Sequence, residues 1–163
     1  MTRRAWMAAY AAFFATSSHS RSATPLLPLN ESGFRQMVAS HRSKILLVDF
    51  WATWCAPCRE ELPHLIALHA AKRSKGFDFV TISCDEPEQA AAAAQWVTAQ
   101  GAPPPHYIRR ASNDDAFINS IDPKWSGALP ALFVFDRNGR QSRSFIGETG
   151  LKQLTAYIDT LLQ

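Results

Sequence analysis

An apolar run that ends beside a pair of cysteines constrains this chain more than any other feature. Residues 44–51 read KILLVDFW, which predicts a strand buried on both faces. Cys55 and Cys58 follow within a few residues, and residues 59–74 have the pattern of a helix interrupted by Pro63. The strand, a short loop and a helix that begins near Cys55 predict an α/β arrangement with the first sulfur at a helix N-terminus.

This position predicts different roles for the two sulfurs. Unpaired backbone N–H groups and the positive end of the helix dipole favour thiolate over thiol at a helix N-terminus. The thiolate is the nucleophile in disulfide exchange. We therefore expect Cys55 to be the exposed, attacking sulfur, and Cys58, one turn along the helix, to be the buried, resolving sulfur.

Two other interpretations of the cysteine pair are weaker. A structural zinc site needs a full set of ligands, usually in two close pairs, whereas the rest of the chain offers Cys84 and five scattered histidines. A structural disulfide across so short a loop would constrain the unfolded chain very little. A redox-active pair is the favoured interpretation, with no metal and no cofactor. We expect Cys84 to be an inert buried thiol, and His64 and His69 to lie on the surface.

The remaining pattern predicts one α/β domain over residues 24–163, without internal repeats or linkers. Residues 24–29 are expected to be a lead-in without regular structure. Ser32, Asp85 and Ser112 are candidate N-caps of helices. The expected helices are 30–41, 59–74, 85–100, 112–121 and 151–162, and the expected strands are 44–51, 77–83, 106–108, 131–135 and 141–146.

The first 23 residues have the order of a secretory signal peptide. Arg3 and Arg4 precede an apolar run, residues 5–16, which is too short to span a bilayer comfortably. Residues 17–23 are small and polar, and their serines offer cleavage sites. We expect export, with the bacterial periplasm as the destination. An uncleaved segment that tethers the protein to the membrane is the alternative.

The charge balance argues against one class of partner. Without Arg3 and Arg4 the chain has fifteen basic residues against fourteen acidic ones, so its formal charge falls from +3 to +1. No basic stripe with interleaved aromatic residues remains. We therefore expect no binding of nucleic acid.

Residues 48–63, VDFWATWCAPCREELP, resemble the active-site region of the thioredoxin superfamily. Their form is similar to that of the TlpA/ResA-like branch of exported thiol–disulfide oxidoreductases, which contain redoxin domains, and the resemblance extends from about residue 40 to the C-terminus. It implies a thioredoxin fold, in which helices flank a central mixed β-sheet, with an extra helix near residues 85–101. It also implies that Cys55 and Cys58 are the redox pair.

The same resemblance implies a place for the substrate. Leu129–Pro130 matches the family's cis-proline, which faces the disulfide, although a trans proline at the start of a strand is the alternative. Trp51 and Trp54 are expected to shield the disulfide or to fill the core. The residues that we expect to contact the substrate are Trp54, Ala56, Pro57, Leu129 and Pro130.

Two carboxyl groups have candidate catalytic roles. Asp49 lies alone in the apolar strand, where thioredoxins keep a buried carboxylate, and burial would raise its pKa and let it exchange a proton with Cys58. A hydrogen bond to the backbone at the strand end is the alternative. Glu61 matches an acidic residue of the branch, and a solvated helix carboxylate is its alternative.

These features predict thiol–disulfide exchange as the function. The dithiol form would reduce disulfides in exported proteins through a mixed disulfide at Cys55, which Cys58 resolves. Disulfide-bearing exported proteins and a membrane thiol donor are the expected partners. An oxidant or isomerase that donates its disulfide is the alternative within this chemistry. A non-catalytic binding module with the same fold is the alternative from another class.

Overall fold

Six strands form one central sheet in the described part of the chain, which in this computed structural model comprises residues 23–148 and 150–163. They are β1 (Leu27–Leu29), β2 (Ile45–Trp51), β3 (Phe77–Ser83), β4 (His106–Arg109), β5 (Ala131–Phe135) and β6 (Gln141–Ile146). Their order in the sheet is β1-β4-β3-β2-β5-β6. The first four strands in this order are parallel, and β5 and β6 are antiparallel to their neighbours, so the predicted mixed sheet is confirmed. The predicted signal peptide, residues 1–23, lies outside the described residues except for its last residue.

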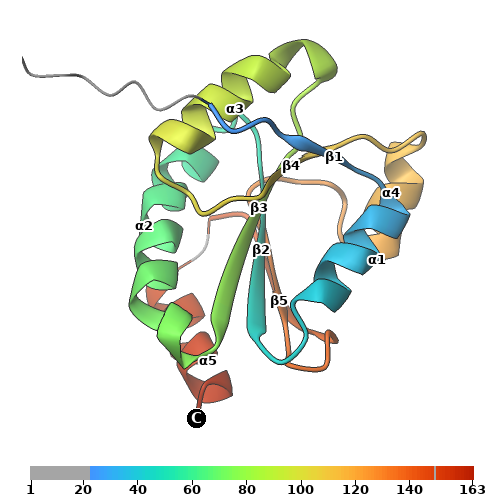
Figure 1. Cartoon of the computed structure of the whole chain (residues 1–163). Helices are drawn as coiled ribbons and strands as arrows, with labels where there is room; N and C mark the ends of the chain where they lie inside the picture. The colour runs from blue at the N-terminus through green and yellow to red at the C-terminus, as the bar shows by residue number, and fades with distance from the viewer. Residues whose placement is uncertain (1–22, 149) are drawn as a thin grey trace, which may run out of the picture.

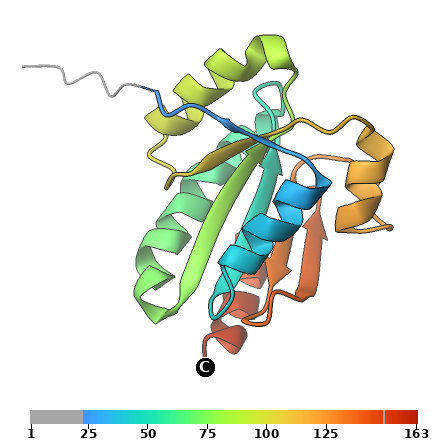
Figure 2. The same cartoon turned by 45° about the vertical axis from the view of Figure 1, so that its right-hand side comes forward.

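Helices cover both faces of this sheet. They are α1 (Glu31–Ser40), α2 (Ala56–Lys72), α3 (Ala90–Ala99), α4 (Asp114–Ile121) and α5 (Leu151–Leu161). Figure 1 shows α2 and α5 on one side of the strands and α1 and α4 on the other, and Figure 2 brings α1 to the front. The insertion that the resemblance implied near residues 85–101 is present as α3, which joins the α2 side of the core.

Strand β2 divides the core into its two halves. Side chains of a strand alternate between faces. Ile45, Leu47 and Trp51 therefore pack with α2, α3 and α5. Phe50, with the other even-numbered residues of the strand, packs with α1 and α4. By the same alternation Asp49 faces the α2 side, which is the side that carries the two cysteines.

The structure corrects the lead-in and two of the candidate caps. Residues 24–29 include a short strand, β1, because this segment pairs in parallel with β4 at the edge of the sheet. Ser32 and Ser112 do not cap their helices. Asn30 caps α1 by accepting a backbone N–H at 2.9 Å, and Asn113 caps α4 by accepting one at 2.8 Å.

The start of α2 is as predicted, and the start of α3 is not. Helix α2 begins at Ala56, directly after the first cysteine. Asp85 does not cap the following helix, because its side chain is hydrogen-bonded to Thr53 in another loop. A short 3-10 turn, Pro87–Gln89, precedes α3 instead.

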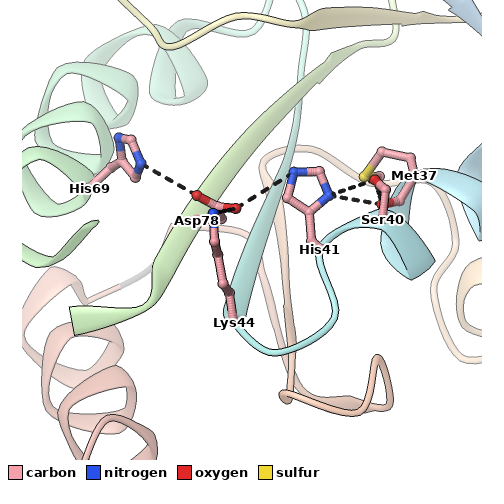
Figure 3. Close-up of polar contacts among 6 residues, drawn as sticks. All are labelled: Met37, Ser40, His41, Lys44, His69 and Asp78. Atoms are coloured by element: carbon pink, nitrogen blue, oxygen red, sulfur yellow. Dashed lines mark hydrogen bonds and ion pairs between the residues drawn. The ribbon is translucent and has the colours of Figure 1, made fainter. Parts of the chain in front are cut away.

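Asp78 joins elements from both faces of the sheet near the start of β3, at the far end from the cysteines. Lys44 donates a hydrogen bond from Nζ to Asp78 Oδ2 at 2.9 Å. Figure 3 shows His41 and His69 on opposite sides of this carboxylate, with their Nε2 atoms 3.8 Å and 3.9 Å from its two oxygens. One carboxylate on β3 thus contacts the loop after α1 and the body of α2.

The surface position predicted for His69 is wrong, whereas His64 is exposed as expected. The His69 side chain is only 14% exposed, because its ring packs against Phe77 and Phe79 at centroid distances of 6.2 Å and 6.3 Å. Burial lowers the pKa of His69, and the negative charge of Asp78 opposes this shift only in part.

This burial predicts a pH dependence of stability. Because the pKa of His69 is lower in the folded protein, the unfolded chain binds the proton more readily. The stabilisation from a neutral His69 is therefore present above the ordinary histidine pKa of about 6.5 and is lost as the pH falls below it. We expect His69→Gln to reduce the fall in the free energy of unfolding between about pH 7 and pH 5, as measured by urea denaturation.

The control for this experiment lies on the same helix. His64→Gln changes an exposed side chain and tests whether any loss of a histidine has the same effect. If the slope with pH in His69→Gln equals that of the unaltered protein, burial of this ring does not contribute to the pH dependence.

Candidate active site

The two cysteines lie at the N-terminus of α2, as the sequence predicted. Cys55 is the N-cap residue, and its backbone N–H closes a turn to Ala52 O at 3.1 Å. Cys55 and Cys58 form a disulfide with a Cα–Cα distance of 5.3 Å. The Cys58 N–H is directed at Cys55 Sγ, 3.3 Å away. Pro57 falls in the first helical turn, where its missing N–H costs no hydrogen bond.

The predicted exposure of Cys55 is wrong. Cys55 is 5% exposed and Cys58 is 2% exposed, so the two differ little. Both belong to the hydrophobic cluster between the sheet and α2, and Leu129 packs against this cluster from the loop before β5. Trp54, in contrast, is 64% exposed and lies at the surface next to the disulfide in the sequence.

The two tryptophans before the pair therefore have different surroundings. Trp51 is a core residue, because it is 1% exposed and packs on Trp96 of α3 at a centroid distance of 4.8 Å. Trp54 does not fill the core and presents its indole to solvent. For Trp51 the core-filling interpretation is the one that the structure favours.

Asp49 is a buried carboxyl group with an unsatisfied oxygen atom. It is 2% exposed, and its Oδ2 has no hydrogen-bond partner among the described residues. No backbone hydrogen bond to its side chain is present there, so the structural alternative for Asp49 is not supported. Burial raises the pKa of Asp49 well above its ordinary value, and the charge of Glu61 raises it further.

Glu61 is the second unusual carboxyl group of the site. It is 9% exposed, and its buried Oε1 also lacks a partner within the described ranges. Burial raises the pKa of Glu61 to about 7. The solvated-carboxylate interpretation is therefore wrong for Glu61, although Glu60 beside it is exposed as expected.

Two hollows are lined by residues that adjoin the cysteines in the sequence, Pro57 in one and Trp54 in the other. One, of about 230 Å³, is lined by Pro57, Glu61 and Pro130 and by the outer residues Glu60, His64, Glu148 and Leu151. The other, of about 260 Å³, contains Trp54 and Leu129. The Leu129–Pro130 peptide between them is cis, as expected. Four of the five residues predicted to contact substrate thus line a hollow beside the cysteine pair, and Ala56 lines a third hollow with Arg59 and Trp96.

The hollow beside Trp54 contains residues that the sequence analysis did not assign to the site. Cys84, at the end of β3, and Arg109, at the end of β4, both line it. Arg109 is paired with Asp114 and lies 3.7 Å from Glu86. These residues come from separate segments whose proximity depends on the order of the strands, so no local pattern could have shown it.

The loop before Cys55 is held from an unexpected side. The Asp85 carboxylate, from the segment after β3, accepts hydrogen bonds from the Thr53 N–H and from the Thr53 hydroxyl. It also accepts one from the Ser83 hydroxyl at 2.8 Å. An Asp after a core strand is the sequence signal for this contact, but the same pattern also predicts a helix cap.

Neither a metal site nor a membrane-spanning helix is found in the part of the chain that the structure describes. No group of three or more His, Cys, Asp or Glu residues there is arranged to hold a metal ion. No helix there is long and apolar enough to cross a bilayer.

The sheet order, the cysteine pair at the start of α2 and the cis-proline before β5 define a thioredoxin-fold protein with a paired-cysteine site. The model of one family, described as Redoxin, matches residues 21–158. The chain therefore belongs to the Redoxin family, in the TlpA/ResA-like branch of the thioredoxin superfamily.

Named relatives agree with this assignment. The chain is 29% identical over 117 residues to the thiol-disulfide oxidoreductase ResA of Bacillus anthracis, which covers 72% of this chain and 63% of the relative. It is 35% identical over 121 residues to the thiol:disulfide interchange protein HelX of Rhodobacter capsulatus, which covers 73% of this chain and 61% of the relative. The chain thus spans less than two thirds of the length of each of these relatives.

Solved structures show the same fold. A thioredoxin-family thiol:disulfide interchange protein from Chlorobium tepidum superimposes with a TM-score of 0.63 at 24% identity, over 87% of this chain and 98% of that chain. A DsbF homologue from Corynebacterium diphtheriae superimposes with a TM-score of 0.62 at 25% identity, over 76% of each chain.

The surroundings of Cys84 predict an unreactive thiol. Cys84 is partly buried, rather than fully buried as expected, and packs against the core on the α1 side. Its desolvation raises the pKa of Cys84 to about 12, although Arg109 opposes the shift. In the reduced, folded protein at pH 7, we expect iodoacetamide to label Cys84 at least about 100-fold more slowly than an unperturbed cysteine, because its thiolate fraction is so small. Peptide mapping measures the labelling, and complete labelling in guanidinium is the control. Rapid labelling of folded protein would mean that Cys84 is an activated thiol.

Proposed function

We propose that this chain is a thiol–disulfide oxidoreductase that reduces disulfides in exported proteins. The observation that carries the proposal is the disulfide at the N-terminus of α2, where the Cys58 N–H is directed at Cys55 Sγ. Once the disulfide is reduced, the same N–H and the helix dipole stabilise a thiolate at Cys55. Membership of the Redoxin family and the names of the relatives support the same chemistry.

The reaction exchanges one disulfide for another in two steps. The Cys55 thiolate attacks a substrate disulfide, forms a mixed disulfide and releases one substrate thiolate. Cys58 then attacks the sulfur of Cys55, restores the internal disulfide and releases the second substrate thiol. Two electrons and two protons pass from the protein to the substrate, so a thiol donor must reduce the protein before the next cycle.

Asp49 is the proposed proton acceptor for Cys58 in the second step. It faces the α2 side of the sheet, and its unpartnered Oδ2 is an acceptor within the described core. Glu61 is the proposed link to solvent, because it lines the hollow beside Pro57 and Pro130 and its charge influences Asp49. A buried acid with a raised pKa is suited to accepting a proton near neutral pH.

The two hollows beside the disulfide are the proposed substrate surface. Trp54 and Leu129 line one, Pro57 and Pro130 line the other, and Ala56 lies between the cysteines. Because Cys55 is only 5% exposed, a substrate disulfide must approach along this surface to reach the sulfur. An extended segment of the substrate that lies against Leu129 satisfies this requirement.

We further propose that residues 1–23 direct export as a signal peptide and that residues 24–163 form the working domain in the bacterial periplasm. A membrane thiol donor would then supply the electrons.

Cys58→Ser leaves the mixed disulfide at Cys55 unresolved. Covalent capture of exported proteins by this variant, and not by a variant that also carries Cys55→Ser, identifies the substrates.

Asp49 and Glu61 are distinguished by the pH dependence of the reaction. We expect the rate of disulfide-peptide reduction to rise with pH as Asp49 loses its proton, and Asp49→Asn to lower this rate about 100-fold and to remove the rise. Because the charge of Glu61 raises the pKa of Asp49, Glu61→Gln should move the rise to lower pH. Single-turnover rates from pH 5 to pH 9 measure both effects.

The free energy of unfolding distinguishes a catalytic role of Asp49 from a general disruption of the fold. A carboxyl group whose pKa is raised by folding reduces stability as the pH increases above its ordinary pKa of about 4. Asp49→Asn should therefore increase the free energy of unfolding at pH 8 while it slows the reaction. A pH–rate profile that equals that of the unaltered protein would leave Asp49 with a structural role.

The direction of the reaction is predicted from the residues between the cysteines. Ala56 and Pro57 bring neither a charge nor a side-chain donor that would hold Cys55 as thiolate. We expect a potential nearer to about −270 mV, as in thioredoxin, than to about −120 mV, as in DsbA. Equilibration with glutathione buffers measures it. A value above about −180 mV would replace the reductant with the oxidant or isomerase.

A further inference from the structure

Asp85 is the most completely hydrogen-bonded of the buried carboxylates near the site. Its side chain is fully buried, and Oδ1 accepts from the Thr53 N–H at 3.0 Å and from the Thr53 hydroxyl at 2.6 Å. Oδ2 accepts from the Ser83 hydroxyl at 2.8 Å and is 3.1 Å from the Thr53 N–H. Asp49, which is 2% exposed, has no such set of donors within the described residues.

The residue that Asp85 holds belongs to the turn that presents the attacking cysteine. This turn runs from Ala52 to Cys55 and is closed by the Cys55 N–H on Ala52 O at 3.1 Å. Thr53 is its second residue, and the exposed Trp54 is its third. The backbone N–H and the hydroxyl of Thr53 both point to the same carboxylate, so the turn is fixed at one of its two central positions.

The backbone of Asp85 and of the residue before it is also held by hydrogen bonds. The Asp85 N–H donates to the Ser83 hydroxyl at 3.0 Å, and the Asp85 carbonyl accepts from Arg110 Nη1 at 3.2 Å. The Cys84 N–H donates to Trp51 O at 2.7 Å, which extends the pairing of β2 and β3 by one step. The hydrogen bonds of Asp85 therefore fix Thr53, and with it the turn, relative to the end of the sheet.

We propose that Asp85 is a positioning residue that, through Thr53, holds Cys55 ready to close its disulfide with Cys58. The inference rests on the proposed dithiol–disulfide chemistry. Asp85 contacts neither sulfur. It acts because a fixed turn reduces the entropy lost when the two sulfurs meet, which favours the disulfide over the dithiol. Its negative charge beside the turn also disfavours a second negative charge on a thiolate, and this effect has the same sign.

The equilibrium constant for disulfide formation against glutathione tests this role. We expect Asp85→Asn to decrease that constant about tenfold, which corresponds to a rise in potential of about 30 mV. Thr53→Val keeps the shape of the side chain and the charge of Asp85, and should decrease the constant about threefold because one donor is lost. Thr53→Ser retains the hydroxyl and should restore the constant to within about twofold of the unaltered protein.

The control is Asp78→Asn, which removes a carboxylate at the opposite end of the sheet. It should decrease the free energy of unfolding without changing the constant, because a loss that affects both redox states equally does not move their balance. If folded Asp85→Asn, or Thr53→Val, has a constant within about twofold of the unaltered protein, the positioning role is wrong. If Asp85→Asn does not fold, the comparison of Thr53→Val with Thr53→Ser decides by itself.

This result is independent of the direction of the reaction in the cell. The proposed reductant role depends on the absolute potential of the unaltered protein. The role of Asp85 depends on the difference between variants. If the unaltered protein is an oxidant and Asp85→Asn still lowers the constant, the reductant role is contradicted and the positioning role of Asp85 is supported.

Discussion

Burial of β2 on both faces is the constraint on which the rest of the structure depends. All seven of its residues are buried, and it pairs with β3 along its whole length and with β5 along most of it. Because Trp51 pairs with Ser83, the two strands end together. The turn that carries Cys55 and the segment that carries Asp85 therefore leave the sheet at the same edge, and this is why they can be hydrogen-bonded to each other.

A strand buried on both faces makes any polar residue in it costly. Asp49 is such a residue, and the described structure offers no donor to its Oδ2, so its neutral form is favoured by burial. Asp85 lies just beyond the end of β3 and receives donors from Thr53 and Ser83. The difference between the two follows from their surroundings. Asp49 is suited to gaining and losing a proton, whereas Asp85 is suited to holding a turn.

Features set by local pattern were predictable, and features set by contacts between distant segments were not. The apolar runs 44–51 and 77–83 predicted β2 and β3 to within a residue, and the cysteine motif predicted the site at the start of α2. The burial of His69 depends on two rings of β3, and the bond from Asp85 to Thr53 joins residues 32 positions apart. An Asp after a strand is compatible with a helix cap and with this bond, and only the packing of the loops distinguishes them.

The ionisable groups near the disulfide bear on the proposed direction of exchange. The buried ionisable side chains near this end of the described core are acidic, since Asp49 and Glu61 lie on the α2 side and Asp85 holds the preceding turn. The basic residue of the motif, Arg59, places its guanidinium over the ring of Trp96, 5.5 Å from the centroid. It is thus engaged with α3. Negative charge near a thiol disfavours the thiolate, and a dithiol that gains little from ionisation gives up its electrons more readily. These acidic groups, when they are ionised, therefore favour the disulfide as the product, which is the direction that we propose.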